Sequence, residues 1–406
     1  MASELTEIED ARRLVLDRAE RLAPEQVPVA ETLGRVLAAD ARGAEPVPAS
    51  DNSAMDGYAI RSADTAGAES GNPASLRLAG ESRAGHPSAR ALGAGEAIAI
   101  STGAVIPDGA DAVIRVEDTD RDGDSVRVRV AVEPGRDIRR AGEDIEPGQL
   151  VIEAGTEVGP AELGVLASLG APSFSCARRP RLAVLGTGDE LLSPGEPARP
   201  GGVRNTNGLA VTALASRAGA QALGAETVGD DPDATLAAVG RALEADVAVI
   251  CGGVSVGEHD HVRGALDELG TLQVFWGIAL RPGKPTWFGV GPAGGLVFGL
   301  PGNPVSAIVT FILFVRPAIR AMQGADPAAA IVSATLDEDY PKQPGRAHAV
   351  RVRLRQEPDG LRASSTGAQG SHVLTSMLGA DGLAIIPAES GGVAAGESVR
   401  VELLDR

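Results

Sequence analysis

The chain has 406 residues, of which 43% are hydrophobic and 23% charged, and its formal net charge is −18 at pH 7. This length exceeds one typical domain, so the composition predicts a soluble protein of several domains. The acidic balance and the lack of a long Arg or Lys run argue against a nucleic-acid partner, because binding to phosphates requires a basic face. An anionic small-molecule ligand would therefore depend on local basic residues. The candidates are Arg139, Arg140, Arg281, Lys284 and Arg351.

Several features favour a cytoplasmic location without membrane contact. Cys176 and Cys251 have no metal-ligand spacing and fit a reducing compartment. Residues 1–10 are acidic and lack the apolar segment of a signal peptide. The most apolar stretch, Val305–Ile319, falls short of the roughly 20 residues that span a bilayer. It predicts a buried helix that Pro304 opens.

The first part of the chain alternates between helical and β-type patterns. Ile8–Leu22 has helical spacing of its apolar residues, and Glu162–Leu169 has the same pattern. Between them, Ala97–Val132 consists of short apolar runs separated by Gly, Asp and Pro, which is typical of strands joined by turns. Cys176–Pro180 is the expected linker to the next region.

The middle of the chain predicts a doubly wound parallel sheet. Its short apolar runs are Leu182–Leu185, Ala245–Cys251 and Leu296–Phe298, and its helical patterns are Leu209–Ala218 and Ala234–Leu243. Asp233, behind Pro232, is the expected cap of the second helix. Strands that alternate with helices favour parallel pairing, and ligands of such sheets bind outside the carboxyl ends of the strands.

Four Gly- and Pro-rich segments begin where apolar runs stop. They are Gly186–Glu190, Gly252–Asp260, Arg281–Pro285 and Gly299–Ser306. We expect them to face one crevice, where glycines let backbone N–H groups approach an anion. One of the two lysines, Lys284, lies within these segments, and its ammonium suits a phosphate or another oxyanion. A tight strand-to-helix turn is the structural alternative for Gly252–Asp260 taken by itself.

The region after Gly324 changes character again. Ala347–Leu354 and Ser398–Leu404 alternate between apolar and polar residues, and Leu383–Pro387 is apolar. This pattern predicts a small all-β domain at the end of the chain.

An ordered set of motifs makes the chain resemble a known family. The segments are Asp51–Tyr58, Ser101–Ala104, Gly142–Ile145, Thr187–Leu191, Asp230–Pro232, Gly252–Asp260, Pro282–Pro285, Leu300–Ser306 and Gln369–His372. With them the chain closely resembles the molybdopterin molybdenumtransferases, the MoeA and gephyrin E-domain family. The resemblance covers nearly the whole length.

The resemblance implies a multidomain α/β plus β protein. An elongated N-terminal α/β domain would comprise residues 1–45 and 144–177, interrupted by a β-rich inserted domain at 46–143. A MogA-like, molybdopterin-binding parallel α/β domain would cover residues 178–325, and a small C-terminal β-barrel would cover residues 326–406. The family also implies a homodimer, with a cleft shared between the third domain of one subunit and the second domain of its mate. Transient contact with other molybdenum-cofactor enzymes is a further implied partnership.

The implied reaction inserts molybdenum from molybdate into adenylated molybdopterin, with release of AMP and dependence on Mg²⁺. Carboxylates are then required, because Mg²⁺ prefers oxygen ligands. The residues matched to catalytic roles are Asp56, Thr102, Asp144, Glu190, Asp230 and Asp260, with Asp189 beside them. Glu190 and Asp260 are the expected metal or molybdate-positioning groups. Asp56 and Thr102 would enter from the mate subunit, and Asp144 would assist Arg139.

The remaining matched positions are expected to bind the substrate. They are Arg139, Thr187, Gly188, Gly252, Gly253, Ser255, Gly257, Arg281, Lys284, Pro301, Pro304, Ser306, Arg351 and Ser371. The structural alternatives are an ion pair of Asp144 with Arg139 or Arg140, and simple turn roles for the hydroxyls of Thr102 and Ser255.

One position departs from the family pattern. Relatives commonly carry a lysine or arginine after the aromatic residue at Trp276, and here this position is Gly277. Arg281, in turn, fills a place often held by lysine. Either Arg281 compensates for the missing cation, or the oxyanion site is weaker or built differently.

Other functions explain the sequence less completely. A nicotinamide-dependent dehydrogenase would need a third glycine after Gly186-Thr-Gly188. A nucleotide hydrolase with the same parallel-sheet domain fits Thr187–Leu191 but leaves Asp51–Tyr58 and Gln369–His372 unexplained. A scaffold role would require an exposed peptide groove, which the sequence does not plainly show. Adenylation of molybdopterin is the remaining neighbouring activity.

Overall fold

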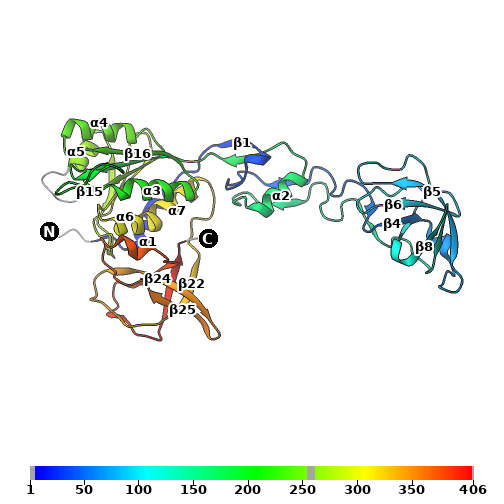
Figure 1. The fold of residues 1–406 in the computed structure, drawn as a ribbon. Coiled ribbons are helices and arrows are strands. Elements are labelled where there is room, and N and C mark those ends of the chain that lie inside the picture. Colours follow the sequence, from blue (N-terminus) through cyan, green and yellow to red (C-terminus); the bar gives the residue numbers. More distant parts are fainter. Residues whose placement is uncertain (1–4, 254–260, 405–406) are drawn as a thin grey trace.

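The computed structural model describes residues 5–253 and 261–404. The molecule is elongated (Figure 1). An α/β module and a β-barrel lie against each other at one end, a slender module follows, and a β-rich module forms the far end. Each of these regions has its own cluster of buried apolar residues.

The α/β module is built on a six-stranded sheet. The strands, in spatial order, are β16 (Gln221–Val228), β13 (Arg181–Thr187), β17 (Val247–Cys251), β21 (Leu296–Leu300), β20 (Trp287–Val290) and β18 (Leu272–Trp276). The first four are parallel; β20 runs antiparallel to β21, and β18 pairs antiparallel with β20, so only β20 is reversed in direction. The link from β20 to β21 is short, and a parallel pair would need a crossover of a dozen or more residues. The predicted fold class is confirmed, with an antiparallel edge added.

Helices cover both faces of this sheet, as the doubly wound class requires. They are α1 (Ile8–Leu16), α3 (Thr206–Arg217), α4 (Pro232–Ala242), α5 (His261–Glu268), α6 (Pro304–Thr310) and α7 (Arg316–Met322), with a π-helical turn at Phe311–Val315. One apolar core joins the sheet to α1, α3, α6 and α7. A second core joins the opposite face to α4 and α5.

The N-terminal helix α1 ends at Leu16, before the predicted Leu22. Its buried residues Ile8, Ala11 and Val15 belong to the core of the α/β module and not to the core of the slender module. The N–H of Thr6 donates to the carbonyl oxygen of Gly277 at 3.0 Å. The start of the chain is therefore anchored on the α/β module.

The apolar helical stretch Pro304–Met322 forms the centre of the α/β module. Among the described residues it is the one helix with the length and apolar composition needed to cross a membrane. In this structure, 78% of its apolar window is buried inside the protein. It serves here as a core helix, and Pro304 is its first residue as predicted.

The cap of α4 differs from the prediction. Asp231 is the N-cap residue, and its side chain accepts a hydrogen bond from the Ala234 N–H at 2.7 Å. Asp233 lies in the first turn. The expectation for Asp233 was wrong because Pro232 occupies the first helical position, where its missing N–H costs nothing, so the cap falls at Asp231, two residues before Asp233.

The slender module joins two separate parts of the chain. β1 (Pro24–Pro28) pairs with β12 (Ser173–Ala177), and β2 (Ala41–Arg42) pairs with β11 (Leu150–Ile152). Helix α2 (Pro160–Ser168) packs on this pair of small sheets. The chain thus leaves the module after β2 and returns with β11, having formed the β-rich module in between.

The β-rich module at the far end contains a second six-stranded sheet. Its order is β7 (Ala112–Arg115), β4 (Gly57–Ile60), β6 (Glu96–Ile100), β5 (Ala74–Ser82), β9 (Ser125–Val128) and β8 (Thr119–Asp122). A small pair, β3 (Asn52–Ser53) with β10 (Ile138–Arg139), lies where the chain enters and leaves it.

The C-terminal region is a closed five-stranded barrel. Its strands are β22 (Ile331–Leu336), β24 (Ala347–Glu357), β25 (Gly360–Ser365), β26 (Gly382–Ile386) and β28 (Ser398–Leu403), and pairing of β24 with β26 closes the ring. The short strands β23 (Tyr340–Pro341) and β27 (Gly392–Val393) pair beside it. β19 (Leu280–Arg281), from the α/β module, adds to β24 in parallel. This pairing connects the two modules.

Replacing the cap of α4 tests its assignment. We expect Asp231→Ala to lower the free energy of unfolding by about 1 kcal/mol, because the Ala234 N–H loses its acceptor. Asp233→Ala, the matched control, should cost about 0.5 kcal/mol or less through the helix dipole. Urea unfolding followed by tryptophan fluorescence measures both, since both tryptophans lie in the α/β module at β18 and β20. Equal losses would contradict the assignment.

Candidate active site

Three loops converge at the carboxyl ends of β13, β17 and β21. The Gly252 N–H donates to the Leu300 carbonyl oxygen at 3.0 Å, and the Asn207 side chain donates to the Gly302 carbonyl oxygen at 2.8 Å. Gly253 has φ +63°, and a Cβ there would lie 2.6 Å from Thr187 Oγ1. A side chain would therefore disrupt the approach of the β17 loop to the end of β13. The predicted meeting of these loops is present.

The fourth Gly- and Pro-rich segment, Arg281–Pro285, meets the start of α6. Together they enclose a cavity of about 250 Å³, which also receives residues from the barrel region. Its polar and charged lining consists of Arg281, Lys284, Asn303, Ser306, Arg346, Gln369 and Ser371. The Ser371 carbonyl oxygen accepts a hydrogen bond from the Val305 N–H at 3.1 Å, which holds the barrel loop against α6.

The charge of this smaller cavity is positive. Arg281, Lys284 and Arg346 line it, and no Asp or Glu is among its described lining residues. In a chain of net charge −18, such a cluster favours a bound anion. The hydroxyls of Ser306 and Ser371 can also donate hydrogen bonds to a bound oxyanion.

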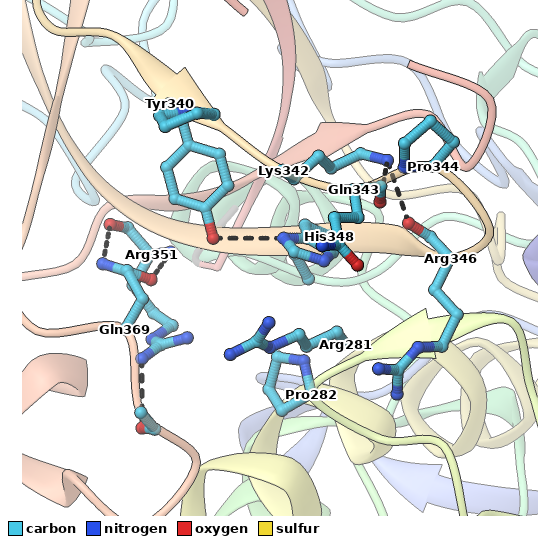
Figure 2. A pocket seen from close by; sticks show the side chains of 13 residues that line it. Arg281, Pro282, Tyr340, Lys342, Gln343, Pro344, Arg346, His348, Arg351 and Gln369 are labelled. Carbon is cyan, nitrogen blue, oxygen red and sulfur yellow. Dashed lines mark hydrogen bonds between the residues drawn. The ribbon is translucent and has the colours of Figure 1, made fainter. Parts of the chain in front are cut away.

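Arg281 and Arg346 also line a larger cavity, of about 480 Å³, on the barrel side of the junction (Figure 2). Tyr340, Lys342 and His348 contribute to its wall. None of these three residues lies in a family motif, so the motifs did not predict them. The presence of Lys342, the second of only two lysines, in a turn between Pro341 and Pro344 was the available signal.

Arg351 is held inside the barrel wall. It is 1% exposed, and its guanidinium donates to Ser376 Oγ at 3.1 and 3.2 Å and to the carbonyl oxygens of Ala368 and Gly370. Burial lowers the pKa of this guanidinium from its ordinary value. The predicted binding residue therefore lines the larger cavity, but its Nε and one Nη donate to Ser376 and to the carbonyl oxygens of Ala368 and Gly370.

The carboxylates of the α/β module lie on exposed loops. Asp189 Oδ1 accepts a hydrogen bond from the Asp230 N–H at 3.1 Å, so these two loops contact each other. The carboxylate of Glu190 folds over Gly188, where an added Cβ would lie 2.2 Å from Glu190 Oε2. Asp189, Glu190 and Asp230 thus place exposed oxygen atoms at the carboxyl edge of the sheet.

Ser255, Gly257 and Asp260 lie outside the described residues, and their assigned roles stay predictions. Within residues 5–253 and 261–404, no group of three His, Cys, Asp or Glu side chains has an arrangement that could hold a metal ion. The assignment of Glu190 with Asp260 to a metal likewise stays a prediction.

Asp56 and Thr102 form a pair at the surface of the β-rich module. Asp56 Oδ1 accepts hydrogen bonds from the Thr102 N–H at 2.7 Å and from Thr102 Oγ1 at 3.0 Å. These bonds, the backbone one first, hold the pKa of the Asp56 carboxyl below its usual range. Asp56 is therefore an ionised and oriented carboxylate at neutral pH.

The other residues assigned to this face are Arg139 and Asp144, and both are exposed. Arg140 pairs with Asp51 at 2.6 Å. Across the described part of the chain, no ion pair joins Asp144 to Arg139 or Arg140, so the alternative of a structural ion pair finds no support. The expected assistance of Arg139 by Asp144 is not seen as a direct contact either.

The two groups of site residues are far apart within one chain. Asp56 and Thr102 lie beside β4 and β6, in the β-rich module at one end of the molecule. The ends of β13, β17 and β21 belong to the α/β module at the other end of the molecule (Figure 1), and residues of this module and of the barrel line both cavities. Asp56 and Glu190 therefore cannot contribute to the same site within one chain.

Gly277 has a structural explanation. Its φ is +87°, a backbone conformation that favours glycine, and a Cβ would lie 2.9 Å from the Leu5 side chain. Its carbonyl oxygen accepts from the Thr6 N–H, and its own N–H donates to the Thr286 carbonyl oxygen at 2.9 Å. Gly277 thus forms the turn that leads to β19, and Arg281 supplies the cation of the cavity.

The fold and site define a class of protein: a multidomain α/β and β protein with a basic cavity beside the carboxyl edge of its sheet. Family models match three successive regions, described as the MoeA N-terminal region (domain I and II) at residues 6–170, a probable molybdopterin binding domain at 183–321 and the MoeA C-terminal region (domain IV) at 333–404.

Full-length relatives agree with these matches. Molybdopterin molybdenumtransferase 2 of Mycobacterium tuberculosis is 37% identical over 97% of this chain and 98% of the relative. Molybdopterin molybdenumtransferase of Haemophilus influenzae is 35% identical over 96% and 98% of the respective chains. The crystal structure of the molybdopterin biosynthesis MoeA protein of Pyrococcus horikoshii OT3 matches with a TM-score of 0.82 and 32% identity, covering 98% of this chain and 100% of that one.

The chain belongs to the molybdopterin molybdenumtransferases, transferases of molybdenum cofactor biosynthesis. The resemblance seen in the sequence is thereby confirmed.

The Asp56–Thr102 pair can be tested by titration. Thr102→Val removes the hydroxyl donor but keeps the backbone N–H, so the pKa of Asp56 should rise only part of the way to its ordinary value. Carboxyl carbon shifts in NMR titrations of wild type and variant measure this change. Ser125→Ala, which removes a hydroxyl bonded to the Asp122 carbonyl oxygen in the same module, should leave the pKa of Asp56 unchanged. An unchanged pKa in Thr102→Val would contradict the pairing.

Proposed function

We propose that the protein inserts molybdenum from molybdate into adenylated molybdopterin, with release of AMP and dependence on Mg²⁺. The observation that carries this proposal is the smaller basic cavity. It combines two cationic side chains that have no carboxylate partner among the described residues, Arg281 and Lys284, with the hydroxyls of Ser306 and Ser371 in a chain of strongly negative net charge. A tetrahedral oxyanion such as molybdate fits this donor set.

The organic substrate would bind along the neighbouring sheet edge. Thr187, Gly188, Gly252 and Gly253 bring backbone groups close together there, which suits a phosphate-bearing ligand. Pro301 is buried beside them and fixes the local backbone without taking part in chemistry. The oxyanion cavity and the edge of the sheet share the loop between β21 and α6, so both substrates would meet at this loop.

The exposed carboxylates have the oxygen donors of a Mg²⁺ site, but the described ones are not arranged as a preformed metal site. Asp189, Glu190 and Asp230 offer oxygen ligands, which Mg²⁺ prefers, and they lie at the edge where the phosphoanhydride would bind. When bound, Mg²⁺ would neutralise negative charge that develops on the phosphate groups. The role of the protein residues is to orient the adenylate and to keep molybdate adjacent to it.

We further propose a homodimer with a shared cleft. The support is the separation of Asp56 and Thr102 from the α/β module within one chain, since a second copy can bring its β-rich module to that edge. Cytoplasmic location is part of the same proposal, and it agrees with Cys176 and Cys251 being buried and free of disulfides.

The reaction itself is tested directly. Purified protein incubated with adenylated molybdopterin, molybdate and Mg²⁺ should release AMP and yield active cofactor, and removal of Mg²⁺ by a chelator should stop the release. Absence of AMP release by a folded protein would refute the proposed reaction.

The role of Glu190 is tested by substitution. Glu190→Gln should lower turnover by about a hundredfold or more, because it removes a charge that acts on the reacting phosphates, with little change in thermal stability. Glu196→Gln changes another exposed carboxylate of the same segment and should keep full activity. A parallel loss of stability in Glu190→Gln would instead indicate a structural role.

The shared cleft is tested by mixing inactive variants. Asp56→Asn and Glu190→Gln homodimers should each be inactive, whereas mixed dimers contain one site with both residues intact. If the subunits exchange at random, about a quarter of the wild-type activity should return. A protein that sediments as a dimer but shows no recovery would contradict the shared site.

A further inference from the structure

A third cavity, of about 350 Å³, lies where the α/β module meets the slender module and the C-terminal region. It shares no lining residue with the two basic cavities. Helix α3 shows the separation, because its first turn, with Asn207 bound to Gly302, lies at the carboxyl edge of the sheet. The last turns of the same helix, with Leu214 and Arg217, line the third cavity. The cavity therefore lies toward the amino edge of the sheet, away from the transfer site.

Most of the wall of this cavity is apolar. The core helix contributes Ile308, Phe311 and Ile312, each at most 9% exposed, and the C-terminal region contributes Met377 and Leu404. The volume falls within the 300–1,000 Å³ range of small-molecule sites. An apolar wall of this size favours the apolar body of an organic ligand, because burying that body removes hydrocarbon surface from water.

The π-helical turn at Phe311–Val315 explains how one helix lines the cavity over several turns. In a regular α-helix, residues four apart are rotated by about 40° from each other, so a row of them winds around the helix. A π turn holds more residues per turn and cancels part of this rotation. Ile308, Ile312, Arg316 and Arg320 consequently all reach the same cavity. The widened turn thus places two arginines in line with the apolar wall.

Arginines form the polar part of the wall. Arg320 pairs with Glu157 at 2.9 Å, and Arg316 donates to the Leu404 carbonyl oxygen at 2.8 Å. Arg217 is the third arginine, whereas Glu157 is the single carboxylate of the described lining. A guanidinium carries five N–H donors, so one that is bound to a protein acceptor can still donate to a ligand. In a chain of net charge −18, this locally positive wall favours an anionic head group.

We propose that this third cavity binds an organic anion with an apolar body, of the acyl or aryl carboxylate class. The apolar wall receives the body of the ligand, and the guanidinium groups of Arg217 and Arg316 receive its carboxylate. An inorganic anion would leave the apolar wall without a partner, and a neutral apolar ligand would not use the positive charge. The site goes beyond the transfer reaction, because it lies apart from the residues assigned to that reaction.

Binding would also stabilise the junction between modules. A ligand in this cavity contacts α3 and the core helix of the α/β module, Glu157 beside the slender module, and Met377 and Leu404 of the C-terminal region. The Arg320–Glu157 pair already connects two of these parts. Because the ligand binds the folded arrangement, its occupancy raises the temperature of unfolding.

Matched ligands test the charge and the shape of the site in the wild-type chain. Calorimetric titration of the full chain with 2-naphthoate and with its neutral analogue 2-naphthamide compares two ligands of nearly equal size. We expect 2-naphthoate to bind about tenfold more tightly, the effect of a charge-assisted hydrogen bond, and to raise the temperature of unfolding. Octanoate in the same titration distinguishes the two ligand bodies, since tighter binding than 2-naphthoate would identify an acyl chain and weaker binding an aryl group.

Two pairs of variants locate the ligand. Met377→Gln places a polar group in the wall and should weaken 2-naphthoate binding by about tenfold. Its neighbour Leu378 is 69% exposed and does not line the cavity, so Leu378→Gln should bind as wild type. Arg217→Gln should lower the preference for 2-naphthoate over 2-naphthamide by about fivefold. Arg181→Gln, which changes an exposed arginine of the same module, should keep this preference.

Three results would overturn the proposal. The first is that wild type binds neither carboxylate at millimolar concentration, or binds 2-naphthamide as tightly as 2-naphthoate. The second is equal binding of 2-naphthoate by Met377→Gln and Leu378→Gln, which would place the ligand elsewhere. The third is displacement of 2-naphthoate by millimolar molybdate, which would place it in the transfer site. None of these measurements depends on AMP release, so failure here is distinguishable from failure of the proposed reaction.

Discussion

The pairing of β19 with β24 is the contact on which the site depends. It aligns Leu280 with Ala347 and Arg281 with His348, and so joins the α/β module to the barrel. The short strand carries Arg281 to the junction, where the guanidinium lines both basic cavities. This pairing and the hydrogen bond from the Val305 N–H to the Ser371 carbonyl oxygen together fix the loop containing Lys284 relative to Ser371. The main apolar core of the α/β module extends to Ala347, Ala349 and Leu383 of the barrel, and the two modules share one positively charged boundary beside it.

Electrostatics explains why this boundary is selective. The chain carries 55 acidic against 37 basic residues, so anions are repelled from most of its surface. At the junction the lining residues include several cations and no described carboxylate. Because the cations are held by neutral carbonyl and hydroxyl oxygens, their charge is available to a ligand. An oxyanion is therefore attracted to one small region of an otherwise acidic molecule.

The elongated shape has a different consequence. The slender module places the β-rich module, where Asp56 and Thr102 lie beside β4 and β6, at the opposite end from the α/β module (Figure 1). The pair is nevertheless well ordered by two hydrogen bonds, and its carboxylate is ionised. An oriented charge on an exposed surface suits a role in a site completed by another molecule. This arrangement is the reason for proposing that two copies of the chain build each cleft.

The sequence by itself determined the local elements and the family. Apolar runs bounded by Gly and Pro were sufficient to predict β13, β17 and β21, and the ordered motifs identified the transferase class. Local patterns could not give the antiparallel edge of the sheet, the cap at Asp231 or the anchoring of α1, because each depends on neighbours in space. Only the tertiary structure brought His348 and Lys342 next to Arg281. Such contacts depend on the pairing of short strands that lie far apart in the chain. The residue pattern of one strand does not indicate which other strand it pairs with.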